Sequence, residues 1–461
     1  MKKTTFLKWL FIPCIMFIAG WFNTAFADDY YWIGGSGNWS EFNLHWATTS
    51  GGAVMHTEVP GADDDVYFDA NSFTGPGEVV TIDVNAYCNN IDWTGVTNTP
   101  DLAGSSALYV SGSLTYNPAM TASFTGWLSF VSSQAGNTID FSTLALSMSS
   151  VQFNGEGEWT LLSDIDLSLM GGSFTLTRGT INTNGITISV GSFQSWPGTG
   201  FRVMNLGSSV INCQWINIWD GGSLTLNAGT STINTETNWF DGQNLTYYNV
   251  NFEPTWPTTI MIMGSNTFHN LGLSNNNISE VIFPSNATQT VFDMDFSGSC
   301  SNLIPVHSDV TGEAAYIKKI SGTLQEDYLI LQDLNVIGGA TFITDHGIDL
   351  GNVTNWTINS GTGTTLYWVG GSGNWSDADH WSTSSGGAYP SGETCLPSDV
   401  DNVVFDANSF TGPGETVTLD VNGFFNNMDW SGVTNNPVFA SGTGNELNVF
   451  GSLTFDPGMD I

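Results

Sequence analysis

Basic residues are almost absent from this sequence. Its 461 residues include 7 Lys and Arg against 43 Asp and Glu, which gives a formal net charge of −36 at pH 7. A surface of this charge repels the phosphate backbone of nucleic acids and anionic lipid headgroups. We therefore expect no nucleic-acid partner, whereas cations are favoured as counter-ions. The same acidity also serves simply to keep a protein soluble.

Long hydrophobic runs are missing except at the start of the chain. The apolar stretch Trp9 to Phe22 follows three lysines, Lys2, Lys3 and Lys8. Small residues come after it in Ala25-Phe26-Ala27. This order predicts a secretory signal peptide, residues 1–27, cleaved after Ala27, with an uncleaved anchor as the alternative. No later run is long and apolar enough to span a bilayer, so we expect an exported chain without a transmembrane segment.

Cysteine is scarce too. Four cysteines lie beyond the predicted cleavage site, and no two of them form a C-x-x-C pair; they are Cys88, Cys213, Cys300 and Cys395. This excludes a small disulfide-rich scaffold. We expect isolated thiols or at most one bridge.

Helical periodicity is the last absence, and short alternating runs take its place. Segments such as "ALYVSGSLTY" (107–116) alternate apolar and polar residues, and Gly, Asn, Asp or Ser interrupt them. This pattern predicts an all-β fold with tight turns. Two architectures fit: a parallel β-helix (solenoid) and β-sandwich modules. The long, loosely repetitive body favours the solenoid.

One phrase occurs twice. "YWIGGSGNWS" (31–40) returns as "YWVGGSGNWS" (367–376), and the longer segment 63–100 returns as 400–437. The duplication predicts a first β-rich module over residues 28–361 and the start of a second, truncated copy over residues 365–461.

The repeated phrase is rich in tryptophan and glycine. Glycines permit sharp turns close to ring faces, and a solenoid must cover its apolar end. We therefore interpret the phrase as a structural cap made of Trp32, Gly34, Gly35, Gly37, Trp39 and Trp46, and of Trp368, Gly370, Gly371, Gly373, Trp375 and Trp381. A sugar-binding platform is the alternative for these tryptophans. His45 and His380 lie beside the third tryptophan of each copy, and we expect them to pack against its ring rather than to bind a metal.

The phrase belongs to a longer pattern. W-x-G-G-x-G-x-W is followed by a third Trp, a Pro, D-x-V-x-F and T-h-D, as in "DNVVF" (401–405) and "TVTLD" (416–420). This pattern resembles autotransporter-associated β-strand repeats and, more closely, repetitive surface proteins of Bacteroidetes. The resemblance implies export, often by type IX secretion, and an adhesin-like role at the cell surface. It supplies no catalytic residues.

Aspartates cluster at equivalent places in the two copies. Calcium prefers six to eight oxygen ligands in a flexible cage, which clustered carboxylates and turn carbonyls supply. The candidate ligands are Asp63, Asp65 and Asp69, and Asp399, Asp401 and Asp406. Alternatively these residues only end strands and shape turns. Calcium is the single cofactor that the sequence predicts.

Catalytic motifs are not found. A lyase needs a basic residue, and the predicted mature chain retains only Arg178, Arg202, Lys318 and Lys319. A glycosidase needs two carboxylates, for which Asp164 and Asp166 are the nearest pair. The sequence therefore predicts an exported, non-catalytic, adhesin-like structural protein whose partner is an extracellular glycan or surface protein. The alternative is a polysaccharide-binding or polysaccharide-degrading β-helix protein.

Overall fold

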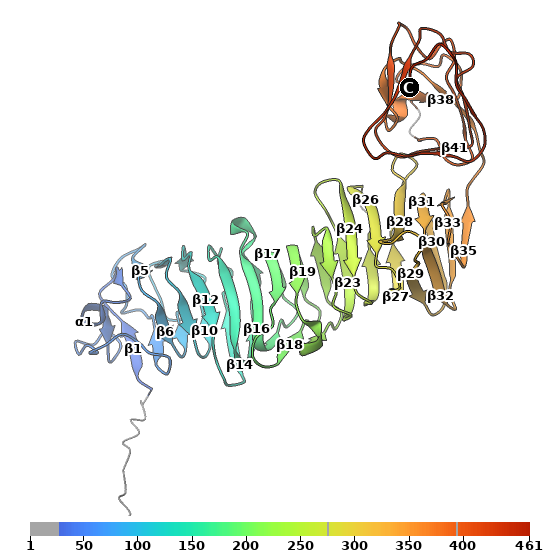
Figure 1. Cartoon of the computed structure of the whole chain (residues 1–461). Coiled ribbons are helices and arrows are strands. Elements are labelled where there is room, and N and C mark those ends of the chain that lie inside the picture. The colour runs from blue at the N-terminus through green and yellow to red at the C-terminus, as the bar shows by residue number, and fades with distance from the viewer. Residues whose placement is uncertain (1–26, 274–275, 393–394) are drawn as a thin grey trace, which may run out of the picture.

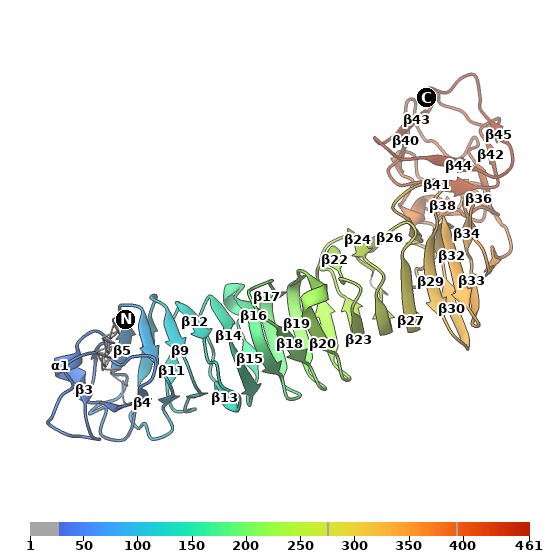
Figure 2. The same ribbon diagram turned by 60° about the horizontal axis from the view of Figure 1, so that its bottom comes forward.

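The chain forms a parallel β-solenoid of about 18 turns, with 46% of its residues in strands and 3% in helices. The structure is a computed structural model that describes residues 27–273, 276–392 and 395–461. The predicted signal peptide therefore lies outside the described residues except for Ala27. The turns stack into a gently curved rod, and the last part of the chain forms a second body set at an angle to the end of the rod (Figure 1, Figure 2). The predicted solenoid is confirmed, and the sandwich alternative is not.

One sheet of 22 strands runs along most of the rod. Its strands are β1 (Asp29–Trp32), β3 (Trp46–Ala47), β4 (Asp65–Tyr67), β6 (Ala86–Cys88), β7 (Ile91–Asp92), β9 (Leu108–Val110), β10 (Leu114–Thr115), β12 (Trp127–Phe130), β13 (Asn137–Asp140), β14 (Ser150–Leu161), β15 (Ile165–Asp166), β16 (Ser173–Asn182), β17 (Thr187–Ser195), β18 (Arg202–Asn205), β19 (Val210–Ile218), β20 (Leu224–Asn227), β21 (Thr232–Thr235), β23 (Thr246–Phe252), β25 (Thr267–Gly272), β27 (Thr288–Asp295), β29 (Ala315–Lys319) and β32 (Leu334–Gly338).

Three smaller sheets complete the rod. They contain β2 (Gly37–Asn38), β5 (Val79–Ile82), β8 (Asp101–Gly104) and β11 (Thr121–Ala122); β22 (Trp239–Asp241), β24 (Thr258–Met263), β26 (Ile278–Phe283), β28 (Ile304–Ser308), β31 (Leu329–Gln332) and β34 (Ile348–Asp349); and β30 (Thr323–Asp327), β33 (Thr341–Asp345) and β35 (Trp356–Asn359). The helical segments are α1 (Phe42–His45) and the 3₁₀ turns η1 (Ser168–Met170), η2 (Gly221–Ser223) and η3 (Ala378–His380).

The interior of the rod is built mainly by alternation of buried and outward-facing side chains. Along β14 every second side chain is buried over most of the strand. Parallel pairing then places like residues on top of one another, so that Phe153, Phe174 and Phe193 follow each other through the core with ring centroids 5.2 and 5.4 Å apart. Such stacking buries large aromatic areas on every turn, and it explains why a loosely repetitive sequence can support one continuous hydrophobic cluster from Tyr30 to Phe342.

Outward-facing asparagines reinforce the stack. Asn205 donates its side-chain N–H to the Asn182 carbonyl oxygen at 2.6 Å, and Asn227 repeats the contact with Asn205 at 2.7 Å. A second row has the same form: Asn234 donates to Asn212, and Asn251 donates to Asn234, both at 2.9 Å. Each partner lies one turn earlier in the chain, so these ladders fix the register of neighbouring turns.

The second body repeats the beginning of the rod. Its strands are β36 (Thr365–Trp368), β37 (Gly373–Asn374), β38 (Trp381–Ser382), β39 (Asn402–Val404), β40 (Thr416–Leu419), β41 (Gly423–Phe425), β42 (Asn427–Asp429), β43 (Val438–Ser441), β44 (Leu447–Val449) and β45 (Leu453–Thr454). It has a hydrophobic cluster of its own, from Leu366 to Phe439.

The two bodies are joined by packing and by a covalent bond. Phe424 of β41 packs against Ile330 of β31 and Ile348 of β34. Beside this contact, Cys300 and Cys395 form a disulfide, and the Leu396 N–H donates to the Cys300 carbonyl at 2.9 Å. Cys88 and Cys213 are buried free thiols. The sequence predicted isolated thiols or at most one disulfide, and one disulfide is found. In the described part of the chain, no helix is long and apolar enough to cross a membrane.

Candidate functional site

The tryptophans of the first repeated phrase lie inside the end of the rod. The rings of Trp32, Trp39 and Trp46 have no exposed surface. The Trp32 indole N–H donates to the Gly35 carbonyl at 2.7 Å, and the Trp46 indole N–H donates to the Trp39 carbonyl at 2.9 Å. Both Trp32 and Trp39 meet Trp46 edge to face. No ring face remains for stacking on a sugar.

The glycines of the phrase are required by its shape. Gly34 and Gly35 have φ values of +81° and +78°, which side chains rarely adopt. A Cβ atom on Gly37 would lie 2.0 Å from Nε2 of His45. That histidine stacks on Trp32 with ring centroids 4.5 Å apart, and its Nδ1 lies 2.7 Å from the Ile33 carbonyl oxygen. The histidine thus packs with the buried tryptophans, as the cap interpretation expects.

The second copy reproduces this geometry. Trp368 and Trp381 have no exposed surface and Trp375 has 1%, while Gly370 and Gly371 have φ values of +88° and +79°. The Trp368 indole N–H donates to the Gly371 carbonyl at 2.7 Å, and a Cβ on Gly373 would again lie 2.0 Å from the histidine, here His380.

Four of the six aspartates of the calcium prediction accept hydrogen bonds from backbone turns or neighbouring amides; they are Asp65, Asp69, Asp401 and Asp406. Asp65 accepts hydrogen bonds from Asn89 and Asn90, and Asp69 accepts from the backbone N–H of Asn71 at 2.8 Å. Asp63 is an exposed turn residue.

In the second copy, Asp401 accepts from the Thr364 and Ser398 backbone N–H groups, and Asp406 accepts from Asn408. Burial raises the pKa of Asp399. Among the described residues, no three His, Cys, Asp or Glu side chains lie close enough together to hold a metal ion. Calcium binding stays a prediction, since turn carbonyls would have to supply most of its ligands.

Asp164 and Asp166, the nearest candidates for a glycosidase pair, both accept hydrogen bonds within the rod, Asp164 from the next turn of the solenoid and Asp166 from a residue two positions along the chain. Asp164 accepts from the backbone N–H of Thr187 at 2.8 Å, and Asp166 accepts from the Ser168 hydroxyl at 2.6 Å. The absence of catalysis stays a prediction.

Buried titratable groups occur elsewhere in the rod. The Glu326 side chain on β30 accepts hydrogen bonds from the Ser297 hydroxyl at 2.8 Å and the Phe296 N–H at 3.1 Å. Burial, together with the negative charge of Asp295, raises the pKa of this carboxyl to about 7. No feature of the sequence pointed to this residue.

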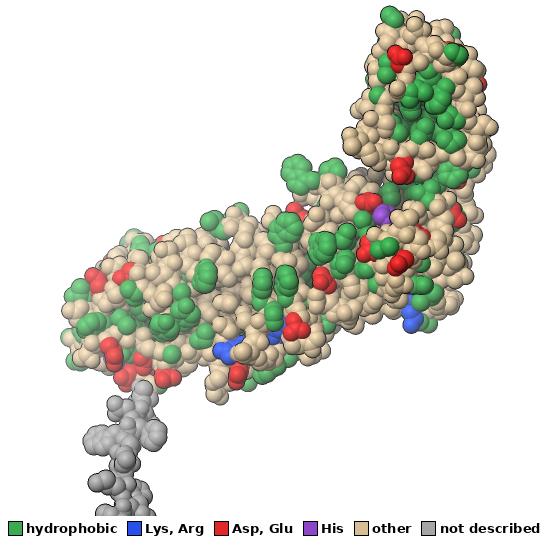
Figure 3. Space-filling model, in the orientation of Figure 1, with side chains coloured by type: hydrophobic (Ala, Val, Ile, Leu, Met, Phe, Trp, Pro, Cys, Tyr) green, Lys and Arg blue, Asp and Glu red, His purple; other side chains and the backbone are tan. Residues whose placement is uncertain are grey.

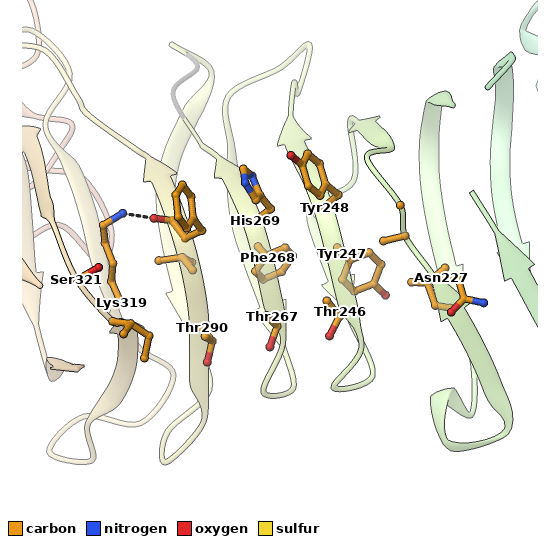
Figure 4. Close-up of a pocket in the computed structure, with 16 residues that line it drawn as sticks. Asn227, Thr246, Tyr247, Tyr248, Thr267, Phe268, His269, Thr290, Lys319 and Ser321 are labelled. Carbon is orange, nitrogen blue, oxygen red and sulfur yellow. Dashed lines mark hydrogen bonds between the residues drawn. The ribbon is translucent and has the colours of Figure 1, made fainter. Parts of the chain in front are cut away.

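Large side chains are also exposed along the middle turns, where they protrude from the rod (Figure 3). One group surrounds a hollow of about 640 Å³ (Figure 4). Tyr248, His269 and Phe292 extend from successive strands of this hollow and stack at 4.1 and 4.7 Å, and the Lys319 ammonium donates to the Phe292 carbonyl and lies over its ring. Because these rings stack on each other, most of their faces are occupied within the protein.

A second region lies on neighbouring turns and has free ring faces. Two hollows of about 450 and 360 Å³ share Gln214, Glu236 and Thr255 in their walls and together form one groove. Trp215 and Trp256 line one end of it and are 50% and 78% exposed. No motif of the sequence predicts this groove. The only signals were the adjacent Gln214 and Trp215, where alternation breaks within β19, and the proline-flanked Trp256.

Comparison of the chain with models of protein families, with curated proteins and with solved structures gives no match in any of the three. The resemblance to Bacteroidetes surface proteins therefore rests on the sequence motifs alone.

Proposed function

We propose that this protein is an exported, adhesin-like structural protein that presents an extended β-solenoid at or outside a bacterial surface and performs no catalysis. The observation that carries the proposal is the single hydrophobic cluster that runs from Tyr30 to Phe342 through successive turns. A solenoid of this kind is a stiff rod whose length places its far turns away from the point of attachment.

Three further features support the proposal. The sequence before Asp28 has the order of a secretory signal. A net charge of −36 keeps a long rod soluble and discourages self-association. The Cys300–Cys395 disulfide suits an oxidising compartment outside the cytoplasm.

The test is made on intact cells of the source organism. Proteinase K is added to the cells, and the protein is followed with an antibody against the rod. We expect the signal to disappear without cell lysis, while a cytoplasmic marker protein survives. N-terminal sequencing of the protein from the surface fraction should begin at Asp28. A protein that stays protected in intact cells and retains Met1 would contradict the proposal.

A further inference from the structure

We propose that the groove between η1 and the loop after β23 is a binding site for a neutral oligosaccharide chain. This site rests on the proposed function, because its ligand is a glycan that the protein would meet outside the cell. The groove crosses successive turns of the solenoid, from Ser168 through Asn212 and Asn234 to Thr255. Its long direction therefore follows the stacking direction of the turns, as a bound polymer chain would require.

Hydrogen-bonding side chains line the groove at regular intervals. Asn212 donates to the Ser189 hydroxyl at 3.3 Å, and Asn234 donates to Asn212 at 2.9 Å. An amide has two N–H groups and two acceptor positions, and the ladder uses one of each. The Gln214 side chain makes no hydrogen bond within the described parts of the chain. Sugar hydroxyl groups, which both donate and accept, match such a row of spare donors and acceptors.

Two tryptophans supply the apolar contact that a pyranose ring needs. The exposed rings of Trp215 and Trp256 line the same hollow, and neither one stacks on another aromatic ring of the described chain. Trp256 lies between Pro254 and Pro257, whose fixed φ angles limit the motion of its loop. The Asn277 amide donates to the Pro254 carbonyl at 2.9 Å and holds the loop further. Placing exposed tryptophans on a restrained backbone lowers the entropy lost on binding.

The charge of the groove selects against acidic chains. Glu236 and Glu253 line it, and none of its lining residues is Lys, Arg or His. Within the described parts of the chain, Glu236 accepts only a long hydrogen bond, 3.4 Å, from the Thr255 hydroxyl, so its oxygens remain available to sugar hydroxyls. A polyuronate would bring its own carboxylates against these two and be repelled. The combination of free ring faces, amides and uncompensated acids therefore fits a neutral saccharide.

The test is affinity electrophoresis of the purified full-length mature chain in native gels that contain mixed-linkage β-glucan, xyloglucan, galactomannan or dextran. The acidic protein enters such gels readily. We expect at least one of these neutral polymers to retard it, and polygalacturonate to leave it unretarded. The double substitution Trp215→Ala and Trp256→Ala should reduce the affinity for the retarding polymer at least tenfold, because truncating an aromatic anchor removes most of a local binding contribution.

Trp127→Ala is the matched control. Trp127 on β12 is 61% exposed, yet it does not line the groove. It should leave both the retardation and the far-ultraviolet spectrum unchanged, and the double variant should also keep its spectrum and melting midpoint. The inference is overturned if all four neutral polymers fail to retard the protein, if only polygalacturonate does so, or if the double variant binds as the control does.

The two proposals fail in different ways. A protein that is cleaved on intact cells but is not retarded by any neutral polymer retains its proposed function and loses this site. A protein that is retarded through Trp215 and Trp256 but stays inside the cell retains the site and loses the proposed surface role.

Discussion

The tryptophans of the caps and those of the groove share one chemistry and occupy opposite environments. Trp32, Trp39 and Trp46 are sealed under glycine turns, whereas Trp215 and Trp256 stand in solvent on the middle turns. Burying an indole stabilises a fold through its large apolar area, and exposing one leaves that area for a partner. In this solenoid, the position of a tryptophan within its turn therefore decides whether its ring is buried in the core or exposed to solvent.

The largest test of this comparison removes a cap tryptophan. Trp32→Ala should lower the free energy of unfolding by about 3–5 kcal/mol, since it leaves a cavity where a fully buried ring packs against Trp46. Trp127→Ala should change it by less than about 0.5 kcal/mol. Denaturant unfolding followed by near-ultraviolet circular dichroism measures both. If the two variants lost the same free energy of unfolding, the expected difference between buried and exposed tryptophans would be wrong.

In the second body, the stability of the tryptophan cluster can be tested separately from the attachment of this body to the rod. Cys395→Ser leaves the Trp368 cluster intact but opens a loop of 95 residues, which should destabilise the docked arrangement by about 2–4 kcal/mol. Limited proteolysis should then cut the connection between the two bodies faster, while a fragment that contains the second cap survives. Unchanged cleavage would mean that the non-covalent contacts, including those of Phe424, hold the bodies together without the disulfide.

A buried carboxyl offers a test that depends on pH. The folded pKa of Glu326 is about 7, above its ordinary value of 4.5, so the folded state holds a proton that the unfolded state has lost between these values. The contribution of Glu326 to the free energy of unfolding should therefore be largest below pH 4.5. It should fall by up to about 3 kcal/mol as the pH rises to 7. Glu326→Gln should flatten that fall. Glu236→Gln, in the open groove, is the control and should leave the slope as in the wild type.

A single methyl group tests the packing of the cap at finer scale. Gly37→Ala places a Cβ atom against His45 and should cost about 1–3 kcal/mol through displacement of the ring from Trp32. Gly75→Ala, where a Cβ would meet no atom within 4 Å, should be nearly neutral. Thermal melts of the two variants distinguish them, and a neutral Gly37→Ala would show that the histidine yields without loss.

The smallest expected effect concerns calcium. Because four of the six aspartates already accept hydrogen bonds from turns or amides, millimolar calcium should leave the melting midpoint close to its value in chelator. A reproducible rise that chelator reverses would instead mean that turn carbonyls complete a site around Asp63, Asp65 and Asp69 or their second-copy equivalents, since a ligand that binds only the folded state must stabilise it.

The parts of this molecule that follow local rules could be predicted from the sequence. Period-two alternation and Asn and Gly turns predict an all-β fold, and the long, loosely repetitive body favours the solenoid that is found. The repeated Trp-Gly phrase points to the tryptophans that are buried. The groove could not be predicted, because its walls come from different turns of the solenoid, and the sequence does not show which residues of those turns lie side by side. Trp215 and Trp256 come together only through the register of β19, β21 and β23, and the break in alternation at Gln214 becomes meaningful only when that register is known. The Cys300–Cys395 pairing likewise depends on how the second body packs against the rod.

The most direct test of the account measures stability and binding on the same two variants. Trp46→Ala and the double variant Trp215→Ala, Trp256→Ala are each unfolded in denaturant and each titrated with the neutral polymer that retards the wild type. We expect a crossed result. Trp46→Ala should lose stability and, while folded, bind as the wild type does, whereas the double variant should keep its stability and lose at least tenfold in affinity. Parallel losses of stability and binding in both variants would contradict it.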